Sequence, residues 1–402
     1  MEIVNIYENY NKYFNGDFKA VFEQLSKIAS ISGHKLYLIG GIVRDLLLEK
    51  ENFDIDITVE GDAIEFVKVL ENERSAKIVS LHESFGTAKI EIQGKKIDFA
   101  STRSEIYPKK GHLPVVEKIA CPLELDVVRR DFTVNSLALS LNQNNFADLI
   151  DYVGGFEDLK SKKLRILHEK SFIDDPTRII RGLKFSVRFG FELEKDTLKL
   201  QEEYLRNIDY DMSYKRVKKE LKEAFELNSQ GLFEKFIDER IYKLITQLET
   251  RKPTKNIENL IIKYRPKHHW LVYLGIVGAL ESDDFSDKLE LTKSEKTVIV
   301  GAKSLLGLQV PDDDFGIYRT FGAYGTESLL ILAIYKEEKK VFHYLENLKK
   351  IKLSITGQDL LELGIEPSKL YSEVFDHVLK QKLMTPMMKK SDEIALLRGF
   401  CN

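Results

Sequence analysis

Apolar and polar residues follow different patterns in the two parts of the chain. Up to residue 150, short β-branched runs bounded by glycine and polar residues predict strands, and apolar residues three and four apart predict helices between them. The predicted strands cover 35–41, 53–60, 87–93 and 95–102, and the predicted helices cover 42–50 and 62–73. After residue 150, helical spacing with Lys- and Glu-rich faces dominates. We therefore expect an α+β protein, in which a mixed sheet with helices is followed by an all-helical part.

Composition narrows the class of protein. The 402 residues suffice for several domains, and 43% apolar with 31% charged residues is typical of a globular protein. No run approaches the roughly 20 uncharged apolar residues that cross a membrane, and the N-terminal stretch lacks the regions of a signal peptide. Two cysteines make neither a disulfide framework nor a zinc cluster. We expect a cytoplasmic protein without a membrane partner. Its net charge of −3 requires any nucleic-acid contact to use local basic patches.

The stretch FDIDITVE places Asp54 and Asp56 one residue apart in a β-branched run. Residues two apart on a strand point to the same face, so the two carboxylates repel each other unless a cation lies between them. Mg²⁺ prefers carboxylate oxygens and is usually shared with substrate phosphates. The pair therefore indicates metal-assisted phosphoryl or nucleotidyl transfer. The alternative is an edge strand whose aspartates are simply solvated.

Gly40 and Gly41, in LIGGIVRD, end the first predicted strand and open the next helix. Such a turn leaves backbone N–H groups free to bind a phosphate at the positive end of the helix. Arg44 lies in the first turn and could reach the same phosphate. The alternative is a tight turn with Arg44 on the surface.

Arg129, Arg130 and Asp131, in VVRRDFTVNSLAL, precede an apolar run that we predict to be helical. Two arginines at a helix N-terminus oppose the helix dipole. This conflict indicates a site that needs cations, as a triphosphate would. The alternative is an ordinary helix start with Asp131 as its cap.

Four polar residues in DDPTRIIRGLKF recur every three positions and predict one ridge of a helix: Asp175, Arg178, Arg181 and Lys184. A carboxylate accepts from an exocyclic amine and a guanidinium donates to ring acceptors, so Asp175 and Arg178 could read the edge of cytosine or adenine. The alternative is that Asp175 caps the helix, Pro176 takes its first position and the basic residues form a solvated stripe.

Taken together, these stretches resemble one family, the class II tRNA nucleotidyltransferases or CCA-adding enzymes, together with the bacterial poly(A) polymerases. The similar stretches are GGIVRD followed by DID, then RRDFTVNSLA and DDPTRIIRGLKFSVRFGF, with further similarity over 85–117, 150–168 and 212–221. The resemblance covers residues 35–221, and beyond residue 221 only the helical pattern is similar.

The resemblance implies a polymerase β-like nucleotidyltransferase head at 1–150, a helical neck with a nucleotide-selecting template at 151–225, a helical body at 226–330 and a tRNA-binding helical tail at 331–402. It implies Mg²⁺ as cofactor, held by the catalytic pair Asp54 and Asp56. It assigns nucleotide binding to Gly40, Gly41, Arg44, Asp45, Arg130, Asp131, Asn135, Asp175, Arg178, Arg181 and Lys184. Asp174 and Lys184 stand where the family usually has Glu and Arg. Asp98 is either a third carboxylate or a structural strand-end residue.

The implied activity is the addition of CCA, from CTP and ATP, to the 3′ end of tRNA with release of pyrophosphate, with the acceptor stem held by the helical domains. Three alternatives stay open: addition of the terminal A only, poly(A) addition, and a catalytically silent RNA-binding protein. Addition of CC only is disfavoured because residues 101–127 have the length expected of a flexible loop that CC-only members lack.

Overall fold

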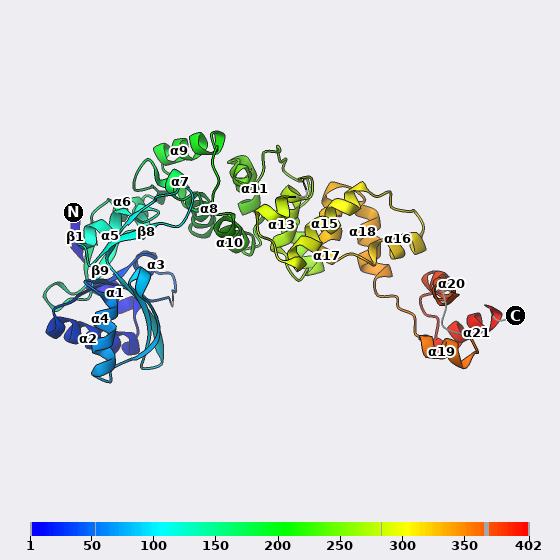
Figure 1. Ribbon diagram of the computed structural model, residues 1–402, viewed down its shortest axis with the longest axis horizontal. Coiled ribbons are helices and arrows are strands. Elements are labelled where there is room, and N and C mark those ends of the chain that lie inside the picture. Colours follow the sequence, from blue (N-terminus) through cyan, green and yellow to red (C-terminus); the bar gives the residue numbers. More distant parts are fainter. Residues whose placement is uncertain (1, 53, 283, 366–369, 401–402) are drawn as a thin grey trace. The chain divides into compact units, whose positions relative to one another are not determined.

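The computed structural model describes residues 2–52, 54–282, 284–365 and 370–400. These residues form two compact units, Met1–Val217 and Lys218–Asn402, coloured blue to green and green to red in Figure 1. The first unit mixes a sheet with helices and the second is helical in its described residues, so the expected α+β class is confirmed.

The first unit is built on an eight-stranded sheet with the order β1-β10-β9-β2-β3-β6-β5-β4. The strands are β1 (Glu2–Asn5), β2 (Lys35–Ile39), β3 (Asp56–Glu60), β4 (Lys77–His82), β5 (Thr87–Ile92), β6 (Lys95–Ser101), β9 (Ala138–Ser140) and β10 (Asp148–Asp151). Neighbours pair antiparallel except β3 and β6, which pair parallel with Asp56 opposite Asp98. The four predicted strands are therefore present. The second of these, predicted over 53–60, begins at Asp56 in the structure; Asp54 precedes it, and Phe53 lies outside the described residues.

Four helices accompany this sheet: α1 (Tyr7–Tyr13), α2 (Gly16–Ser32), α3 (Gly41–Leu47) and α4 (Ala63–Asn72). Helix α4 begins where Asp62 accepts hydrogen bonds from the N–H groups of Ile64 and Glu65, and it buries an apolar face that includes Phe66 and Leu70. The two helices predicted from apolar spacing, α3 and α4, are confirmed.

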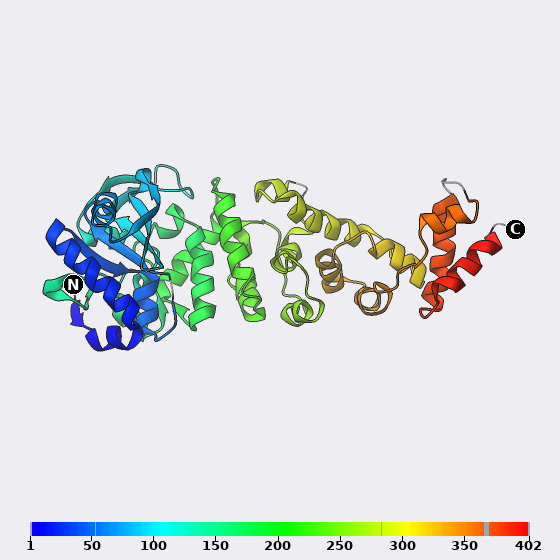
Figure 2. The ribbon, with the colours of Figure 1, turned by 90° about the horizontal axis from the view of Figure 1, so that it is seen from below.

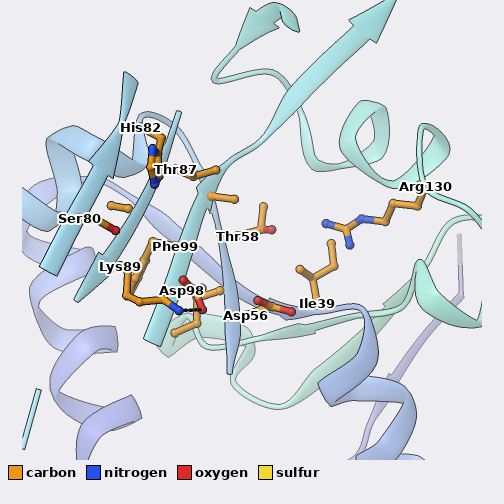
Figure 3. Close-up of a pocket in the computed structure, with 13 residues that line it drawn as sticks. Ile39, Asp56, Thr58, Ser80, His82, Thr87, Lys89, Asp98, Phe99 and Arg130 are labelled. Atoms are coloured by element: carbon orange, nitrogen blue, oxygen red, sulfur yellow. Dashed lines mark ion pairs between the residues drawn. The ribbon is translucent and has the colours of Figure 1, made fainter. Parts of the chain in front are cut away.

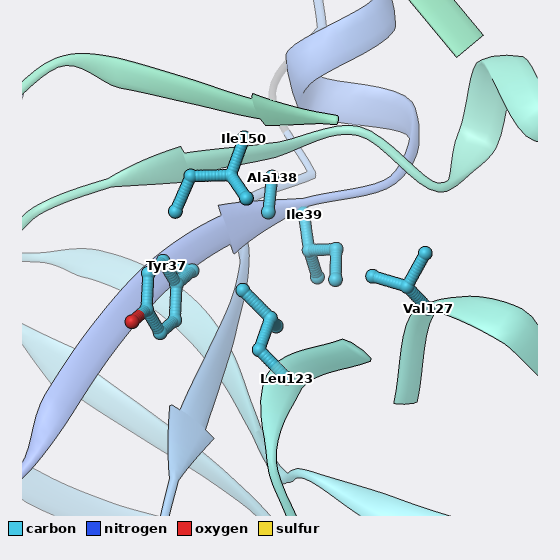
Figure 4. Close-up of a cluster of buried hydrophobic side chains, with 6 residues drawn as sticks. All are labelled: Tyr37, Ile39, Leu123, Val127, Ala138 and Ile150. Carbon is cyan, nitrogen blue, oxygen red and sulfur yellow. The ribbon is translucent and has the colours of Figure 1, made fainter. Parts of the chain in front are cut away.

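The alternation of side chains along β2 gives the sheet two cores. Tyr37 and Ile39 point to a cluster with Ala138 and Ile150 that is closed by α5 (Leu123–Val128), as Figure 4 shows. Leu36 and Leu38 alternate with them and are fully buried too, so they face the opposite side of the sheet, where α2 contacts β2. Burial of β2 on both faces fixes its register, because a slip of one residue would exchange the two sets of side chains.

The run after Arg129 and Arg130 is not the predicted helix. Val134 lies in a 3₁₀ turn, Thr133–Asn135, and the apolar residues that follow form the short strand β9 between β2 and β10. A strand buried on both faces reads as a continuous apolar run, which periodicity alone does not separate from a buried helix.

The rest of the first unit connects the sheet to helices. A separate hairpin is formed by β7 (Arg103–Ile106) and β8 (Val115–Ile119). The remaining elements are α6 (Gly155–Lys160), β11 (Lys163–Leu164), α7 (Ser171–Asp174), α8 (Thr177–Phe189), β12 (Glu192–Leu193), α9 (Lys195–Arg206) and α10 (Tyr214–Phe225). Helix α10 crosses the boundary between the two compact units.

The second unit consists of short helices in its described residues, which Figure 2 shows from below. They are α11 (Gln230–Asp238), α12 (Ile257–Tyr264), α13 (Trp270–Gly278), α14 (Phe285–Lys288), α15 (Lys293–Gly307), α16 (Asp314–Phe321), α17 (Thr326–Tyr335), α18 (Glu338–His343), α19 (Gly357–Glu362), α20 (Leu370–Met384) and α21 (Lys390–Phe400). Helices α13, α15 and α17 pack together, and Gly275 lets α13 approach Ile331 of α17 closely. In the described part of the chain, no helix has the length and apolar content to cross a membrane.

A substitution at Gly155 tests the packing between α6 and the turn at Thr133. A Cβ atom at this position would overlap the carbonyl group of Thr133, which is backbone and has little room to move. We expect Gly155→Ala to lower the free energy of unfolding of the first unit by about 1–3 kcal/mol, measured by hydrogen exchange of its amides. The control is Gly16→Ala, where a Cβ meets no atom within 4 Å. An equal effect of the two substitutions would contradict this packing.

Candidate active site

The parallel pairing of β3 with β6 brings two carboxylates to one edge of the sheet. Asp56 opens β3 and is paired in register with Asp98 of β6, whose N–H donates to the carbonyl oxygen of Ile55 at 3.0 Å. Asp54 lies just before β3 and is exposed, and its N–H donates to Oδ1 of Asn52 at 2.9 Å. The structure therefore places the predicted pair at a strand start, with Asp98 next to it.

Asp56 keeps contact with solvent, but protein atoms crowd one side of its carboxylate. This desolvation, followed by the negative charge of Asp98, raises the pKa of Asp56 to about 6, while the charge of Arg130 opposes the shift. A divalent cation between these carboxylates would stabilise their charged forms and lower the pKa of Asp56.

A pocket of about 530 Å³ opens over this edge of the sheet. Its lining comes from β2, β3, β6, β5 and β4 and from Arg130: Ile39, Asp56, Ile57, Thr58, Ser80, His82, Thr87, Ala88, Lys89, Asp98, Phe99, Ala100 and Arg130 (Figure 3). Lys89 is paired with Asp98, with 3.0 Å between Nζ and Oδ2. Asp98 thus lines the pocket from the middle of β6 and does not stand at the end of a strand.

The carboxylates fit a magnesium ion that is shared with a substrate. Within the described residues, no three or more His, Cys, Asp or Glu side chains are grouped as a complete metal site. Mg²⁺ usually takes only one or two protein carboxylates and completes its octahedron with water and substrate phosphates. Asp54 and Asp56 can supply that share, with Asp98 beside them.

The guanidinium of Arg130 places a positive charge on the other side of the pocket. Its Nη2 donates to Oδ2 of Asp126 at 2.9 Å, and a Cβ atom at Gly40 would lie 3.3 Å from its Nη1. Its Nε is buried and has no hydrogen-bond partner among the described residues. Since Arg130 also lines the pocket, beside a glycine with φ of +77°, its guanidinium suits an anion such as a phosphate.

The expectation that Arg129 and Arg130 stand at a helix N-terminus is wrong. They follow the C-terminal end of α5, where positive charge is favoured by the helix dipole. Asp126, a buried residue of α5, accepts from both arginines. Burial raises the pKa of Asp126, but the charges of Arg130 and Arg129 and their hydrogen bonds outweigh it and hold this pKa below its usual value.

Arg44 and Asp45 lie behind the pocket and not on the surface. Arg44 is buried, donates to Oδ1 of Asp45 at 2.8 Å and to Oδ1 of Asn135 at 2.6 Å, and covers the ring of Phe189 at 4.3 Å. Burial lowers its pKa, and Asp45 opposes this effect. Asp45 also accepts from Nδ2 of Asn52 at 2.8 Å. Because Asn52 in turn accepts from the N–H of Asp54, one chain of hydrogen bonds connects the glycine turn to the segment of Asp54 and Asp56.

Asp131 joins the sheet to α8. Its Oδ1 accepts from the N–H of Phe132 at 2.8 Å and from Nδ2 of Asn135 at 3.0 Å. Its Oδ2 accepts from Arg181 of α8, at 2.8 Å from Nε and 2.6 Å from Nη2. Burial on its own would raise the pKa of Asp131, but Arg181 and Asn135 hold it at about 2. Asp131 is therefore an anchor for α8 and not the cap of a helix.

Asp175 and Arg178 lie together at the start of α8, but not as one exposed ridge. Asp175 precedes the helix in an extended conformation, and α8 begins at Thr177 with Pro176 in the cap position. Oδ1 of Asp175 accepts from the N–H of Thr177 at 3.2 Å and from its hydroxyl at 2.6 Å, which is a capping role. Oδ2 accepts from Nη2 of Arg216 at 2.6 Å.

Arg178 is 4% exposed, so the prediction of a solvated basic stripe is wrong for it. It donates to Oγ of Ser171 at 2.6 Å, to Oη of Tyr107 at 3.2 Å and to the carbonyl oxygen of Arg129 at 2.8 Å. The last bond joins α8 to the segment that carries Arg130. Lys184, further along α8, is half-buried.

Four residues around the site were not singled out from the sequence: Asp126, Tyr107, Ser171 and Arg216. Arg216 lies in the stretch MSYKRVKKEL, which is similar to the family in sequence. That similarity did not indicate that Arg216 pairs with Asp175. Asp126 precedes Arg130 by one helical turn, and this spacing was the available signal. Tyr107 and Ser171 are 71 and 7 positions from Arg178, and no local pattern pointed to them.

The chain is similar to known proteins over its whole length. The family model described as the Poly A polymerase head domain matches residues 36–165. The A-adding tRNA nucleotidyltransferase of Halalkalibacterium halodurans is 30% identical, and the alignment covers 99% of this chain and 96% of that protein. The A-adding tRNA nucleotidyltransferase of Geobacter sulfurreducens is 31% identical over 96% of this chain. The chain spans about half the length of that relative, 47%.

Solved structures of similar proteins agree with this result. A CCA-adding enzyme in an apo form has a TM-score of 0.83 and 26% identity, with 100% of both chains covered. The Thermotoga maritima CCA-adding enzyme in complex with tRNA has a TM-score of 0.78 and 26% identity, again with 100% of both chains covered.

The depressed pKa of Asp131 predicts acid sensitivity. Because its folded-state pKa of about 2 lies below the unfolded value of about 3.9, its ion pair stabilises the fold above about pH 4, and this stabilisation is lost as the pH falls towards 2. We expect wild type to lose about 2 kcal/mol more than Asp131→Asn between pH 5 and pH 2, measured by urea unfolding followed by circular dichroism. A difference between the two proteins that does not change with pH would contradict this role.

Proposed function

Because the chain belongs to the family of tRNA nucleotidyltransferases and poly(A) polymerases, we propose that it transfers nucleotides from CTP and ATP to the 3′ end of tRNA. The observation that carries the proposal is the pocket lined by Asp56 and Asp98 together with Arg130, with Asp54 just before Asp56. Carboxylates for a cation and a guanidinium for phosphates are the two requirements of nucleotidyl transfer.

In the proposed reaction, the oxygen of the tRNA 3′ hydroxyl forms a bond to the α-phosphorus of the nucleotide. The bond from that phosphorus to the bridging oxygen breaks, pyrophosphate leaves, and the hydroxyl proton passes to water. Asp54 and Asp56 would hold Mg²⁺, which when bound neutralises charge on the phosphates and favours ionisation of the hydroxyl. Arg130, beside Gly40 and Gly41, binds the triphosphate, and the Arg44–Asp45 pair keeps the glycine turn in place.

Nucleotide choice is proposed to depend on Asp175 and Arg178. Both are held in fixed positions by several hydrogen bonds, which is what a protein template needs in order to distinguish one base edge from another. Asp131 and Asn135 would meet the sugar and phosphates, and Arg181 and Lys184 lie further along α8. We further infer that residues 226–330 and 331–402 hold the acceptor stem through basic surface residues, and a cytoplasmic location stays a prediction.

Two products are supported by different observations. CCA addition is supported by the similarity in structure to CCA-adding enzymes over the whole chain. Addition of the terminal A only is supported by relatives of that activity that align with 87–99% of the chain at 30–32% identity. The two candidates share the chemistry of the pocket and differ in which tRNA ends are extended.

Primer extension separates them. We expect the purified protein with Mg²⁺ to extend tRNA transcripts that end at the discriminator base or at CC, the first with CTP and then ATP and the second with ATP. Extension of the CC-ended tRNA only would identify an A-adding enzyme. Continued addition of A would identify a poly(A) polymerase, and no extension of any transcript would leave an RNA-binding protein without activity.

The same assay tests the carboxylates. Because the cation would lose a ligand, Asp54→Asn and Asp56→Asn are each expected to reduce the extension rate by at least about 100-fold, with unchanged circular dichroism. Glu91→Gln, an exposed substitution on β5 outside the pocket lining, is the control and should extend at the wild-type rate. Retention of full activity by either aspartate variant would exclude this metal site.

Asp175→Ala distinguishes a template from a cap. If Asp175 only caps α8, its loss costs about 0.5–2 kcal/mol of stability and nucleotide choice stays the same. As a template, its loss should relax discrimination against UTP and GTP by about 10-fold or more, measured as ratios of kcat/KM. Ser229→Ala, which removes the cap of α11, is the matched control: it should lose similar stability without any change in nucleotide choice.

A further inference from the structure

The pocket over the sheet has two sides with the carboxylates between them. The strand order places β5 and β4 on one side of β6 and β3, and Arg130 lies on the other side, next to Ile39 of β2 (Figure 3). The lining on the β5–β4 side is mostly polar: Ser80, His82, Thr87 and Lys89. The proposed contacts to the nucleotide, through Arg130, Gly40 and α8, do not use this side.

The geometry of phosphoryl transfer indicates which substrate binds on the β5–β4 side of the pocket. In nucleotidyl transfer, the attacking oxygen and the leaving pyrophosphate lie in line, on opposite sides of the α-phosphorus. If the triphosphate lies against Arg130, the 3′-terminal nucleotide of the primer has to approach from the side of β5 and β4. This step rests on the function proposed above.

Lys89 is the residue on this side with charge complementary to RNA. Of the residues that line the pocket, Lys89 and Arg130 are the Lys and Arg side chains. Its ammonium lies 3.0 Å from Asp98, and the two side chains are 40% and 51% exposed. A pair with this exposure contributes little net stability, so a competing anion can replace Asp98 at small cost.

We propose that Lys89 binds the phosphate of the primer's 3′-terminal nucleotide. In the free protein its ammonium pairs with the carboxylate of Asp98, which takes the place of that phosphate. When the primer binds, the ammonium moves from Asp98 to the phosphodiester on its flexible side chain. Asp98 is then available to the cation at Asp54 and Asp56. Primer binding and completion of the carboxylate cluster are thereby coupled through one side chain.

Two opposite effects are expected of Lys89→Ala. The loss of a phosphate contact should weaken binding of CC-ended tRNA about 5- to 20-fold, and should reduce the slope of log K against log salt by about 0.7, with the KM for ATP unchanged. In the absence of nucleotide and tRNA, the same variant should bind Mn²⁺ several-fold more tightly than wild type, because Asp98 has lost its competing ammonium. Binding of tRNA is measured by filter retention, and Mn²⁺ by electron paramagnetic resonance of the free ion.

Two further variants control these measurements. Lys89→Arg keeps the charge and should retain tRNA binding to within about threefold. Lys96→Ala removes an exposed lysine of β6 that does not line the pocket, and should change neither tRNA nor Mn²⁺ binding.

The outcomes separate this inference from the function on which it rests. If wild type extends tRNA while Lys89→Ala binds tRNA and Mn²⁺ like wild type, the Lys89–Asp98 pair is an ordinary surface ion pair and the inference is wrong. Equal increases in the KM values for tRNA and ATP would also overturn it, since they would indicate a general distortion of the pocket. If wild type extends no RNA, the proposed function fails, and the primer role of Lys89 fails with it.

Discussion

Two buried carboxylates in the segment 126–135 constrain the site more than any other feature of the first unit. A carboxylate removed from water costs several kcal/mol unless cations and hydrogen-bond donors surround it. Asp126 meets this requirement with Arg129 and Arg130, and Asp131 meets it with Arg181 and Asn135. A different path of this segment would leave at least one charge unpaired.

This constraint explains how residues distant in sequence form one site. Arg130 is directed into the pocket because Asp126 fixes its guanidinium, and α8 is held against the segment because Asp131 pairs with Arg181. Arg178 then reaches the carbonyl oxygen of Arg129. The chain has a small negative net charge, yet at this place it concentrates four arginines around a few carboxylates: Arg129, Arg130, Arg178 and Arg181 around Glu105, Asp126 and Asp131. The proposed recognition of phosphates thus relies on local arrangement and not on overall charge.

Much of this arrangement was predictable from local patterns. The sheet residues around Asp56 and the helices α3 and α4 follow from period-2 and period-3.6 spacing, and the Asp54–Asp56 pair was visible as a metal-binding candidate. Three-dimensional contacts decided the rest. The apolar run after Asn135 is a strand because it pairs between β2 and β10, and its composition alone suits either state. Arg178 is buried because Ser171, Tyr107 and Arg129 supply acceptors from three other segments. The spacing of residues within α8 could not predict these contacts.

The side-chain amide of Asn52 connects two segments of the site. Its Nδ2 supports Asp45 behind the glycine turn, and its Oδ1 fixes the backbone of Asp54. Changes at these positions should therefore be non-additive, since loss of either bond frees the amide to turn and weakens the other. In evolutionary terms, the loop between α3 and β3 is expected to tolerate paired replacements more readily than single ones, and the glycine turn and the segment of Asp54 would then diverge together.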